Sequence, residues 1–218
     1  NKYNNTSYTE TIVCTNPCQE YCSGMIFNQE LSPSEYKGAC NLGSLFLHRF
    51  VDDPFTKFAE INEDELKKSI YIAVNLLDII DKNYFPHKSY ENYQKNMRTI
   101  GLGITGLADA LTMLGKTYND TKFVDNLMNF ITYTAYEASN NLAKLKGAFP
   151  FCNNEKISKS QFITEHVLNY TDCETDWELL QKEISKSGLR NARIISVAPT
   201  GTLSLTYGEN CSSGIEPV

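Results

Sequence analysis

Apolar and polar residues alternate with a helical period in two long stretches of the chain, and the first follows Asn62. Its apolar residues, spaced three and four apart, are Leu66, Ile70, Ala73, Val74, Leu77 and Ile80. Asn62 with Glu65 three residues later is typical of a capping box, and Pro86 ends the pattern. The sequence therefore predicts an amphipathic helix that begins near Asn62 and packs this face against a core.

The second stretch begins near Asn119 or Asp120 and ends at Gly147, a residue that suits a C-terminal cap. Its predicted inward face comprises Phe123, Leu127, Phe130, Ile131, Ala135, Ala138, Leu142 and Leu145. Weaker patterns of the same period cover residues 159–169 and 174–186. We therefore expect the middle and later parts of the chain to be rich in helix.

Short β-branched and apolar runs predict strands near both ends of the chain. Residues 11–13 lead into Asn16, and residues 193–197 read as a buried strand that ends at Pro199. Between residues 19 and 37, many polar side chains with a glycine and a proline indicate a surface excursion. Strands separated by long helices indicate a helix-rich α/β fold, in one segment that covers residues 1–218.

The composition is that of a globular domain: 218 residues, 41% hydrophobic and 21% charged, suffice for one core. The net charge of −6 argues against a nucleic-acid polymer as partner, because a phosphate backbone requires clustered Lys and Arg. The apolar stretch from Ile70 to Ile80 contains Asn75 and Asp78, so it predicts no membrane span. We expect a soluble, cytoplasmic protein.

Seven cysteines without the spacing of a secreted disulfide scaffold predict reduced thiols. Cys14, Cys18 and Cys22 lie four residues apart, which would align three sulfurs on a helix and suggests a metal site. Pro17 argues against that helix, and the sequence offers no fourth ligand in the spacing of known clusters. No metal site is predicted.

Residues 16–20, Asn-Pro-Cys-Gln-Glu, set an amide, a thiol and a carboxylate at alternate positions. Pro17 pushes Asn16 towards an extended conformation, and alternate side chains of an extended chain share one face. Asn16, Cys18 and Glu20 are then able to contact one small substrate together. The alternative is a turn with a buried thiol, since Asn-Pro is a common turn opener.

Gly101, Gly103 and Gly106 match the dinucleotide-binding pattern G-x-G-x-x-G. That pattern requires a buried strand directly before it, and residues 96–99 are mostly polar. We therefore do not interpret these glycines as a dinucleotide site.

The segment from Pro199 to Ser204 combines small side chains, hydroxyl groups and backbone N–H groups. Such a segment binds an anion, especially where a helix begins behind it. A plain turn is the alternative for this composition.

Four blocks occur in order along the chain. They are Asn-Pro-Cys-Gln-Glu at 16–20, Gly-Ala-Cys-Asn-Leu-Gly-Ser at 38–44, Gly-Leu-Gly-Ile-Thr-Gly-Leu-Ala-Asp at 101–109 and Ala-Pro-Thr-Gly-Thr-Leu-Ser at 198–204. With Ser-Ser-Gly-Ile-Glu-Pro at 212–217, they resemble the catalytic subunit of ribonucleotide reductase. The amino-acid sequences of these blocks are most similar to those of the adenosylcobalamin-dependent branch of that family.

The resemblance implies part of a ten-stranded α/β barrel, with close helix packing at the glycine-rich block, and reduction of ribonucleotides to 2′-deoxyribonucleotides. By resemblance, Cys18 is the thiyl radical site that abstracts the 3′ hydrogen, Glu20 takes the proton of the 3′-hydroxyl, and Asn16 holds the ribose hydroxyls. The implied substrate-binding residues are Asn16, Pro17, Cys18, Gln19 and Glu20, and, for the phosphates, Thr200, Gly201, Thr202, Leu203 and Ser204.

Cys40 matches the redox-active cysteine of the family, one half of a dithiol that supplies two electrons and becomes a disulfide. The other half belongs to an upstream portion of the catalytic subunit. The implied partners are therefore a ribonucleotide substrate, the missing remainder of that subunit, and a thioredoxin-type or other dithiol reductant. A structural thiol is the alternative for Cys40.

The source of the radical stays open. The residues of these blocks imply adenosylcobalamin as the source of the radical, whereas other members of the family take the radical from a separate metal-containing subunit. Cys40 follows Cys18 by 22 residues, more than is usual in cobalamin-dependent members, and residues 19–22 replace a glycine-containing continuation. We expect a fragment or split part that is inactive alone. The alternative is a nucleotide-binding or structural remnant without activity of its own.

Overall fold

A computed structural model describes residues 3–26, 37–167 and 175–217. The strands are β1 (Glu10–Thr15), β2 (Cys22–Ile26), β3 (Asn41–Phe46), β4 (Val51–Asp52), β5 (Glu60–Ile61) and β6 (Ile100–Thr105). The α-helices are α1 (Glu63–Leu77), α2 (Lys88–Met97), α3 (Leu107–Met113), α4 (Thr121–Lys146), α5 (Asn154–Ser158), α6 (Trp177–Ser187) and α7 (Gly201–Leu203). Short 3-10 or π-helical turns are η2 (Leu47–Phe50), η3 (Ile79–Lys82), η4 (Phe162–Val167) and η5 (Ser204–Gly208).

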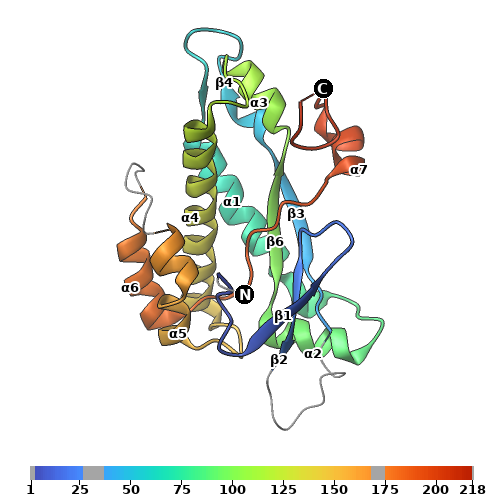
Figure 1. Cartoon of the computed structure of the whole chain (residues 1–218), viewed down its shortest axis with the longest axis vertical. Coiled ribbons are helices and arrows are strands. Elements are labelled where there is room, and N and C mark those ends of the chain that lie inside the picture. The colour runs from blue at the N-terminus through green and yellow to red at the C-terminus, as the bar shows by residue number, and fades with distance from the viewer. Residues whose placement is uncertain (1–2, 27–36, 168–174, 218) are drawn as a thin grey trace.

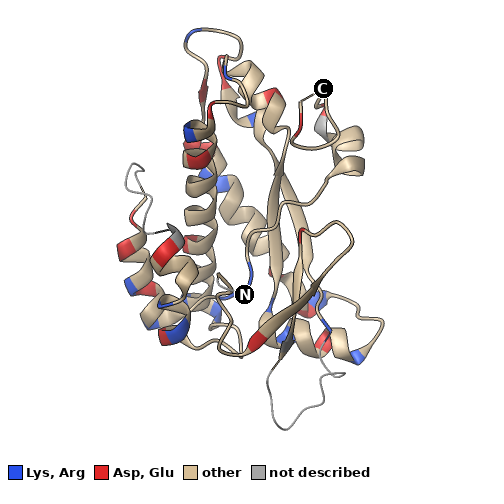
Figure 2. Cartoon of the chain, viewed as in Figure 1, with Lys and Arg blue, Asp and Glu red and all other residues tan. Residues whose placement is uncertain are grey.

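Strand β6 lies at the centre of the molecule. It pairs in parallel with β3, with Asn41 opposite Ile100 at one end and Phe46 opposite Thr105 at the other. In Figure 1, α1 and α4 lie to the left of β6 and α7 lies to its right. Every residue of β6 is buried, as expected for a strand covered on both faces. The paired strands β3 and β6 carry no charged side chain, whereas Glu10 lies on β1 and most other charged side chains lie on helices and loops (Figure 2).

The predicted strand at residues 193–197 lies along the other edge of β6. Ile100 N donates to Arg193 O at 3.0 Å, and Leu102 N donates to Ile194 O at 2.8 Å. Ser196 N donates to Leu102 O at 3.0 Å, and one parallel bridge joins Leu102 to Ile195. The extended run is confirmed, and β6 therefore lies between two parallel neighbours.

The glycine-rich block forms β6 itself, so the expectation that its glycines serve helix packing is wrong. A Cβ atom on Gly103 would lie 2.5 Å from the backbone oxygen of Ser196, and one on Gly101 would lie 2.6 Å from the Ser196 Cβ. Both glycines allow the neighbouring strand to approach closely. Gly106, with φ +68°, then turns the chain into α3.

The two long helices are confirmed as α1 and α4, which pack against each other and share the core with β6. Asn62 caps α1 by accepting a hydrogen bond from Glu65 N at 3.0 Å. The predicted inward position of Leu145 is wrong, since its side chain is 81% exposed. Leu145 lies in the last turn of α4, beyond Ala143, the last buried residue of that helix.

Several elements differ from the expected pattern. Strand β2 replaces the first part of the surface excursion expected at 19–37, because it pairs antiparallel with β1; residues 27–36 lie outside the described residues. Residues 162–167 are π-helical where an α-helix is expected at 159–169, and 168–169 are also outside the described residues. Helix α6 confirms the last predicted helix. None of the helices in the described parts has the length and apolar character that a membrane span requires.

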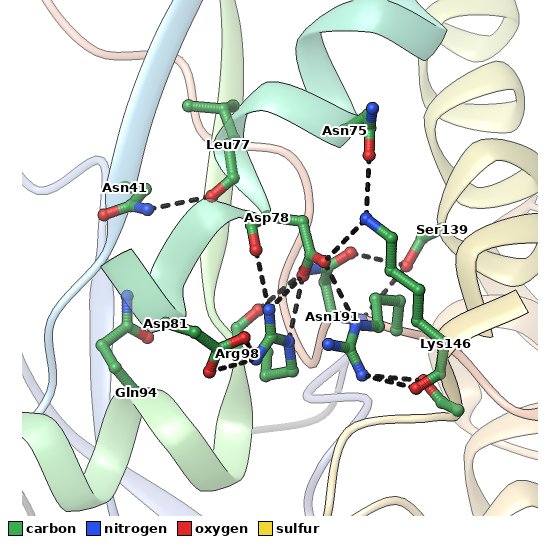
Figure 3. Close-up of polar contacts among 12 residues, drawn as sticks. Asn41, Asn75, Leu77, Asp78, Asp81, Gln94, Arg98, Ser139, Lys146 and Asn191 are labelled. Carbon is green, nitrogen blue, oxygen red and sulfur yellow. Dashed lines mark hydrogen bonds and ion pairs between the residues drawn. The ribbon is translucent and has the colours of Figure 1, made fainter. Parts of the chain in front are cut away.

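One buried carboxylate, Asp78, joins the helices to the strands (Figure 3). Its side chain is 1% exposed and accepts hydrogen bonds from Arg98 Nε at 3.0 Å, Arg190 Nε at 3.1 Å and Asn191 Nδ2 at 3.0 Å. Arg98 also donates to the Asp78 carbonyl at 2.7 Å and to Asp81 at 3.0 Å. Asp78 therefore ties the end of α1 to the residues that begin β6 and the 193–197 strand.

Replacing Asp78 with alanine is expected to leave two arginines buried without their carboxylate. We expect the free energy of unfolding to fall by about 3–5 kcal/mol, the range for breaking one partner of a buried ion pair. Urea unfolding followed by circular dichroism measures it. The control is Asp81→Ala, at a 58% exposed carboxylate on the same arginine, with an expected loss of about 1 kcal/mol or less. Equal losses in both variants would contradict the central role of Asp78.

Candidate functional site

Residues 16–20 form the turn between β1 and β2. Gln19 N donates to Asn16 O at 3.0 Å, Asn16 N donates to Tyr21 O at 3.1 Å, and Gln19 has φ +66°. The expected extended conformation is therefore wrong, because Pro17 occupies the second position of a β-turn, which its fixed φ favours. The alternative is right about the turn and wrong about the thiol, since Cys18, like Pro17 and Gln19, is exposed.

The two polar neighbours of Cys18 are held by different contacts. Asn16 Oδ1 accepts a hydrogen bond from Tyr21 N at 3.1 Å, which stabilises the turn. The Glu20 carbonyl accepts one from Ser196 Oγ at 2.6 Å, which attaches the turn to the 193–197 strand. Glu20 Oε2 is buried and has no hydrogen-bond partner among the described residues. A buried carboxylate oxygen without a partner is costly, so this atom is ready to accept a hydrogen bond or a proton.

Cys40 directly precedes β3 and is largely buried beside Gly101, where an added Cβ atom would lie 3.2 Å from the Cys40 sulfur. Burial raises the pKa of the Cys40 thiol to about 12, while the Arg193 charge opposes this rise and the Glu20 charge adds to it. The same added Cβ atom on Gly101 would lie 2.6 Å from the Cβ of Ser196, whose hydroxyl holds the Glu20 carbonyl, so Cys40 lies near the residue that anchors the turn. Cys40 is therefore a protonated thiol at neutral pH.

A cavity of about 740 Å³ lies between the β1–β2 hairpin, residues 192–196 and α4. Glu20 and Arg193 line it, together with Tyr21, Tyr136 and Phe162. Asn16, Cys18, Cys40 and residues 200–204 do not line it. Of the predicted site residues, the cavity therefore includes Glu20 alone.

The segment 200–204 lies where the 193–197 strand ends, beside the end of β6. Thr200 has φ +59° and precedes α7. Thr200 Oγ1 donates to Thr105 Oγ1 at 2.9 Å, and Ser204 Oγ lies 2.8 Å from the same atom. Both hydroxyls therefore point inwards, away from any anion at the surface. Gly201, Thr202 and Leu203 are half-buried or exposed and present the first helical turn outwards.

Thr105 brings three of the sequence blocks together. Besides Thr200 and Ser204, its hydroxyl donates to Gly214 O at 3.1 Å, and Gly106 N donates to the same carbonyl at 2.8 Å. The blocks at 101–109, 198–204 and 212–217 therefore meet at one end of β6.

The expected lack of a three-cysteine helix agrees with the structure, since Cys14 and Cys22 lie on opposite strands of the hairpin and Cys18 on its turn. Within the residues that the structure describes, no group of three or more His, Cys, Asp or Glu side chains is arranged to hold a metal ion.

The sequence reasoning missed a buried ion pair between Glu10 and Arg193, whose charged atoms lie 2.6 Å apart. Arg193 Nη1 also donates to the hydroxyl of Tyr93 at 2.6 Å. A signal was present, because Glu10 directly precedes the run predicted as a strand at 11–13 and Arg193 opens the run predicted as a buried strand at 193–197. Two such charges are expected to pair when their strands pack together.

Comparison with known proteins relates the whole chain to one family. Residues 1–218 match the family model described as ribonucleotide reductase, barrel domain. The chain is 34% identical over 222 residues to the ribonucleoside-diphosphate reductase large subunit of Caenorhabditis elegans, covering 100% of this chain and 26% of that protein. It is 33% identical over 222 residues to the vitamin B12-dependent ribonucleoside-diphosphate reductase of Thermoplasma acidophilum, covering 100% and 23%. The chain spans about a quarter of the length of these curated relatives.

The raised pKa of Cys40 predicts slow, steeply pH-dependent alkylation. Because only the thiolate reacts and the pKa is about 12, the rate is expected to rise with every pH unit up to pH 11. Iodoacetamide labelling of the folded chain, read for each cysteine by peptide mass spectrometry, measures this. A plateau of Cys40 labelling near pH 9 would contradict the burial argument.

Proposed function

The chain belongs to the ribonucleotide reductase family, and from this premise we propose that residues 1–218 are one segment of the catalytic barrel that reduces ribonucleotides to 2′-deoxyribonucleotides. The observation that carries the proposal is the hydrogen bond of 2.6 Å from Ser196 Oγ to the Glu20 carbonyl. It attaches the turn that bears Cys18 to the strand that continues into Thr200. One strand thus supports both the reacting turn and the candidate phosphate segment.

In the proposed reaction, a thiyl radical at Cys18 takes the hydrogen atom from C3′ of the ribose. Glu20 accepts the proton of the 3′-hydroxyl, the 2′-hydroxyl leaves as water, and Cys18 returns its hydrogen atom to C3′. Cys40 and a second thiol supply the two electrons and the protons, and they end as a disulfide. The exposed sulfur of Cys18 and the unpartnered oxygen of Glu20 support these two roles.

Asn16 is proposed to orient the ribose through the NH₂ group of its carboxamide. Its oxygen accepts from Tyr21 N, so the amide is held in the turn with its donors available to a hydroxyl. Pro17 and Gln19 are proposed to contact the substrate from the same exposed turn. Rigid support of this kind is what a positioned substrate requires.

The distance along strand β6 between the redox thiol and the phosphate segment can be compared with the size of the proposed substrate. Cys40 lies beside Gly101 and Thr200 beside Thr105, so four residues of strand, about 13 Å, separate the redox thiol from the phosphate segment. That span suits a ribose that carries phosphates, with residues 200–204 as the proposed phosphate segment and the backbone N–H groups of residues 200–203 as its proposed donors, because Ser204 N already donates to Thr200 O at 2.8 Å. The relatives are named ribonucleoside-diphosphate reductases, so we propose a diphosphate substrate.

The outer edge of β3 and the position of residues 193–196 support the proposal that further strands complete a ten-stranded barrel. No other described strand pairs with the outer edge of β3, where Leu42 is 43% exposed. Residues 193–196 border the large cavity, which Ile100 at the start of β6 also lines. We propose that the remainder of the catalytic subunit, including the partner cysteine of Cys40, packs along these edges.

The radical is proposed to reach Cys18 from outside the described residues. The exposed sulfur fits adenosylcobalamin, which supplies a carbon-centred radical when bound, and equally a separate metal-containing subunit. A relative named as vitamin B12-dependent supports the first source, and relatives without that name leave room for the second. A thioredoxin-type or other dithiol reductant is the proposed electron donor.

Substitution of Cys18 with serine is expected to abolish activity, because a hydroxyl O–H is too strong a bond to yield the radical under these conditions. The assay combines the chain with the remainder of the catalytic subunit, a dithiol and a ribonucleoside diphosphate, and measures deoxynucleotide formation. Parallel reactions contain adenosylcobalamin or a metal-radical subunit. Cys14→Ser, at an exposed thiol of the same hairpin, is the matched control and should retain activity. Product formation by Cys18→Ser would exclude the thiyl role.

Substitution of Glu20 with glutamine removes the proton acceptor and keeps the shape of the side chain. We expect kcat to fall by about 10²–10⁴-fold, the usual contribution of a general base, with KM changed much less. Steady-state kinetics of the same reconstituted reductase measures both. A rise in KM with unchanged kcat would instead assign Glu20 to substrate binding.

A further inference from the structure

The buried pair of Glu10 and Arg193 has no part in the reaction proposed above. Glu10 lies on β1 and is 1% exposed, while the Arg193 side chain is 16% exposed on the strand beside β6. Thr6 Oγ1 donates to the Glu10 carboxylate, and Tyr93 of α2 donates to its second oxygen at 3.2 Å. The pair therefore fixes one cation at the junction of the hairpin, the central strands and α2.

Arg193 stays charged in this place. Burial works against the charge, but Tyr93 and Glu10 outweigh it and raise the pKa of the guanidinium. The ion pair with Glu10 and the hydrogen bond from Nη1 to the Tyr93 hydroxyl also restrict its rotation. The position of the charge is therefore well defined.

The Arg193 guanidinium lies near the chain segment that carries Cys40, the proposed redox thiol. The Arg193 guanidinium carbon is 5.8 Å from the ring centroid of Tyr21, the residue after Glu20. The Tyr21 hydroxyl packs against Gly38, where a Cβ would lie 2.7 Å from it, and Gly38 precedes Cys40 by two residues. Ile100 N of β6 donates to the Arg193 carbonyl, and Cys40 lies beside the next residue, Gly101, so the two residues flank adjacent positions of that strand.

We propose that Arg193, held by Glu10 and Tyr93, is a positioning residue for the redox chemistry of Cys40, where its fixed charge stabilises the thiolate. The proposal rests on the proposed function only for the role of Cys40 in turnover. When a dithiol reductant attacks the oxidised disulfide, its sulfur bonds to the partner cysteine. The disulfide bond breaks, and the Cys40 sulfur leaves with the electron pair as a thiolate. A nearby cation makes it a better leaving group.

The groups around Cys40 have opposing effects on the pKa of its thiol. Burial raises its pKa, Arg193 lowers it, and Glu20 on the turn raises it again. Tyr21 and Tyr93, whose pKa values burial raises, stay neutral beside the pair. Removing the cation and removing its counter-ion are therefore expected to change Cys40 in opposite directions, which loss of structure alone does not do.

The test is the rate of iodoacetamide labelling of Cys40 in the complete chain at fixed pH, read by peptide mass spectrometry without turnover. Arg193→Gln should label Cys40 about 3 to 10-fold more slowly, as for a pKa raised by half a unit to one unit. Glu10→Gln, which leaves Arg193 without its carboxylate, should label it faster by a similar factor. Arg193→Lys keeps the charge and should stay within about twofold of the wild type.

Internal controls separate charge from loosening of the fold. Cys152, half-buried beside Gly188, and Cys211, exposed beside Asp109, should label at wild-type rates in every variant, because neither lies at the pair. Arg49→Gln, at an exposed ion pair with Glu209, is the matched substitution and should change nothing. Faster labelling of Cys40 in both Arg193→Gln and Glu10→Gln, with Cys152 also faster, overturns the proposal.

If Arg193→Gln does not fold, the other two variants decide. Slower or unchanged labelling of Cys40 in Glu10→Gln, or a large change in Arg193→Lys, then overturns the proposal. Failure of ribonucleotide reduction in the reconstituted enzyme, with these labelling rates as expected, would count against the proposed function and leave the role of Arg193 at the thiol intact.

Discussion

The carboxylate of Asp78 is the constraint on which the arrangement of the described chain depends. A buried charge is tolerated only where partners surround it, and here two arginines and an asparagine do so from different segments. Arg98 lies two residues before strand β6, and Asn191, next to Arg190, lies two residues before the 193–197 strand. Satisfying one carboxylate therefore aligns the start of two parallel strands with the end of α1, before any contact in the candidate site is made.

The strand alignment that Asp78 fixes at the start of β6 also determines which residues meet at the other end of this strand. Gly101 and Gly103 allow the 193–197 strand to lie close, and Ser196 on that strand holds the turn that bears Cys18 through the Glu20 carbonyl. Four residues after Gly101, Thr105 accepts a hydrogen bond from Thr200 of the candidate phosphate segment. A slip by one residue would turn alternate side chains to the opposite face and separate these contacts.

Sequence patterns predicted the parts of the fold that depend on local periodicity. Helices α1 and α4 carry a clear apolar stripe and a cap, so they were predictable. The buried strand β6 was not, because Gly101 and Gly103 alternate with its apolar residues and glycine is depleted in strands. The turn at Pro17 depends on the pairing of β1 with β2, a contact between separate runs. The blocks predicted Cys18, Glu20 and Cys40 as candidate site residues, but nothing local indicated that Thr200 and Ser204 turn inwards to Thr105, because that depends on packing.

Two buried ion pairs, at Asp78 and at Glu10, lie where apolar side chains would also have filled the space. Apolar packing is as stabilising as a buried pair in many proteins, yet it is not directional, whereas each hydrogen bond to a carboxylate fixes a partner in orientation. The two pairs differ in what they hold. Asp78 aligns strands, while Glu10 holds the Arg193 cation, which we propose stabilises the thiolate of the half-buried Cys40. In a site where chemistry requires charge to form on a buried sulfur, a fixed neighbouring cation offsets part of the desolvation that the same burial imposes.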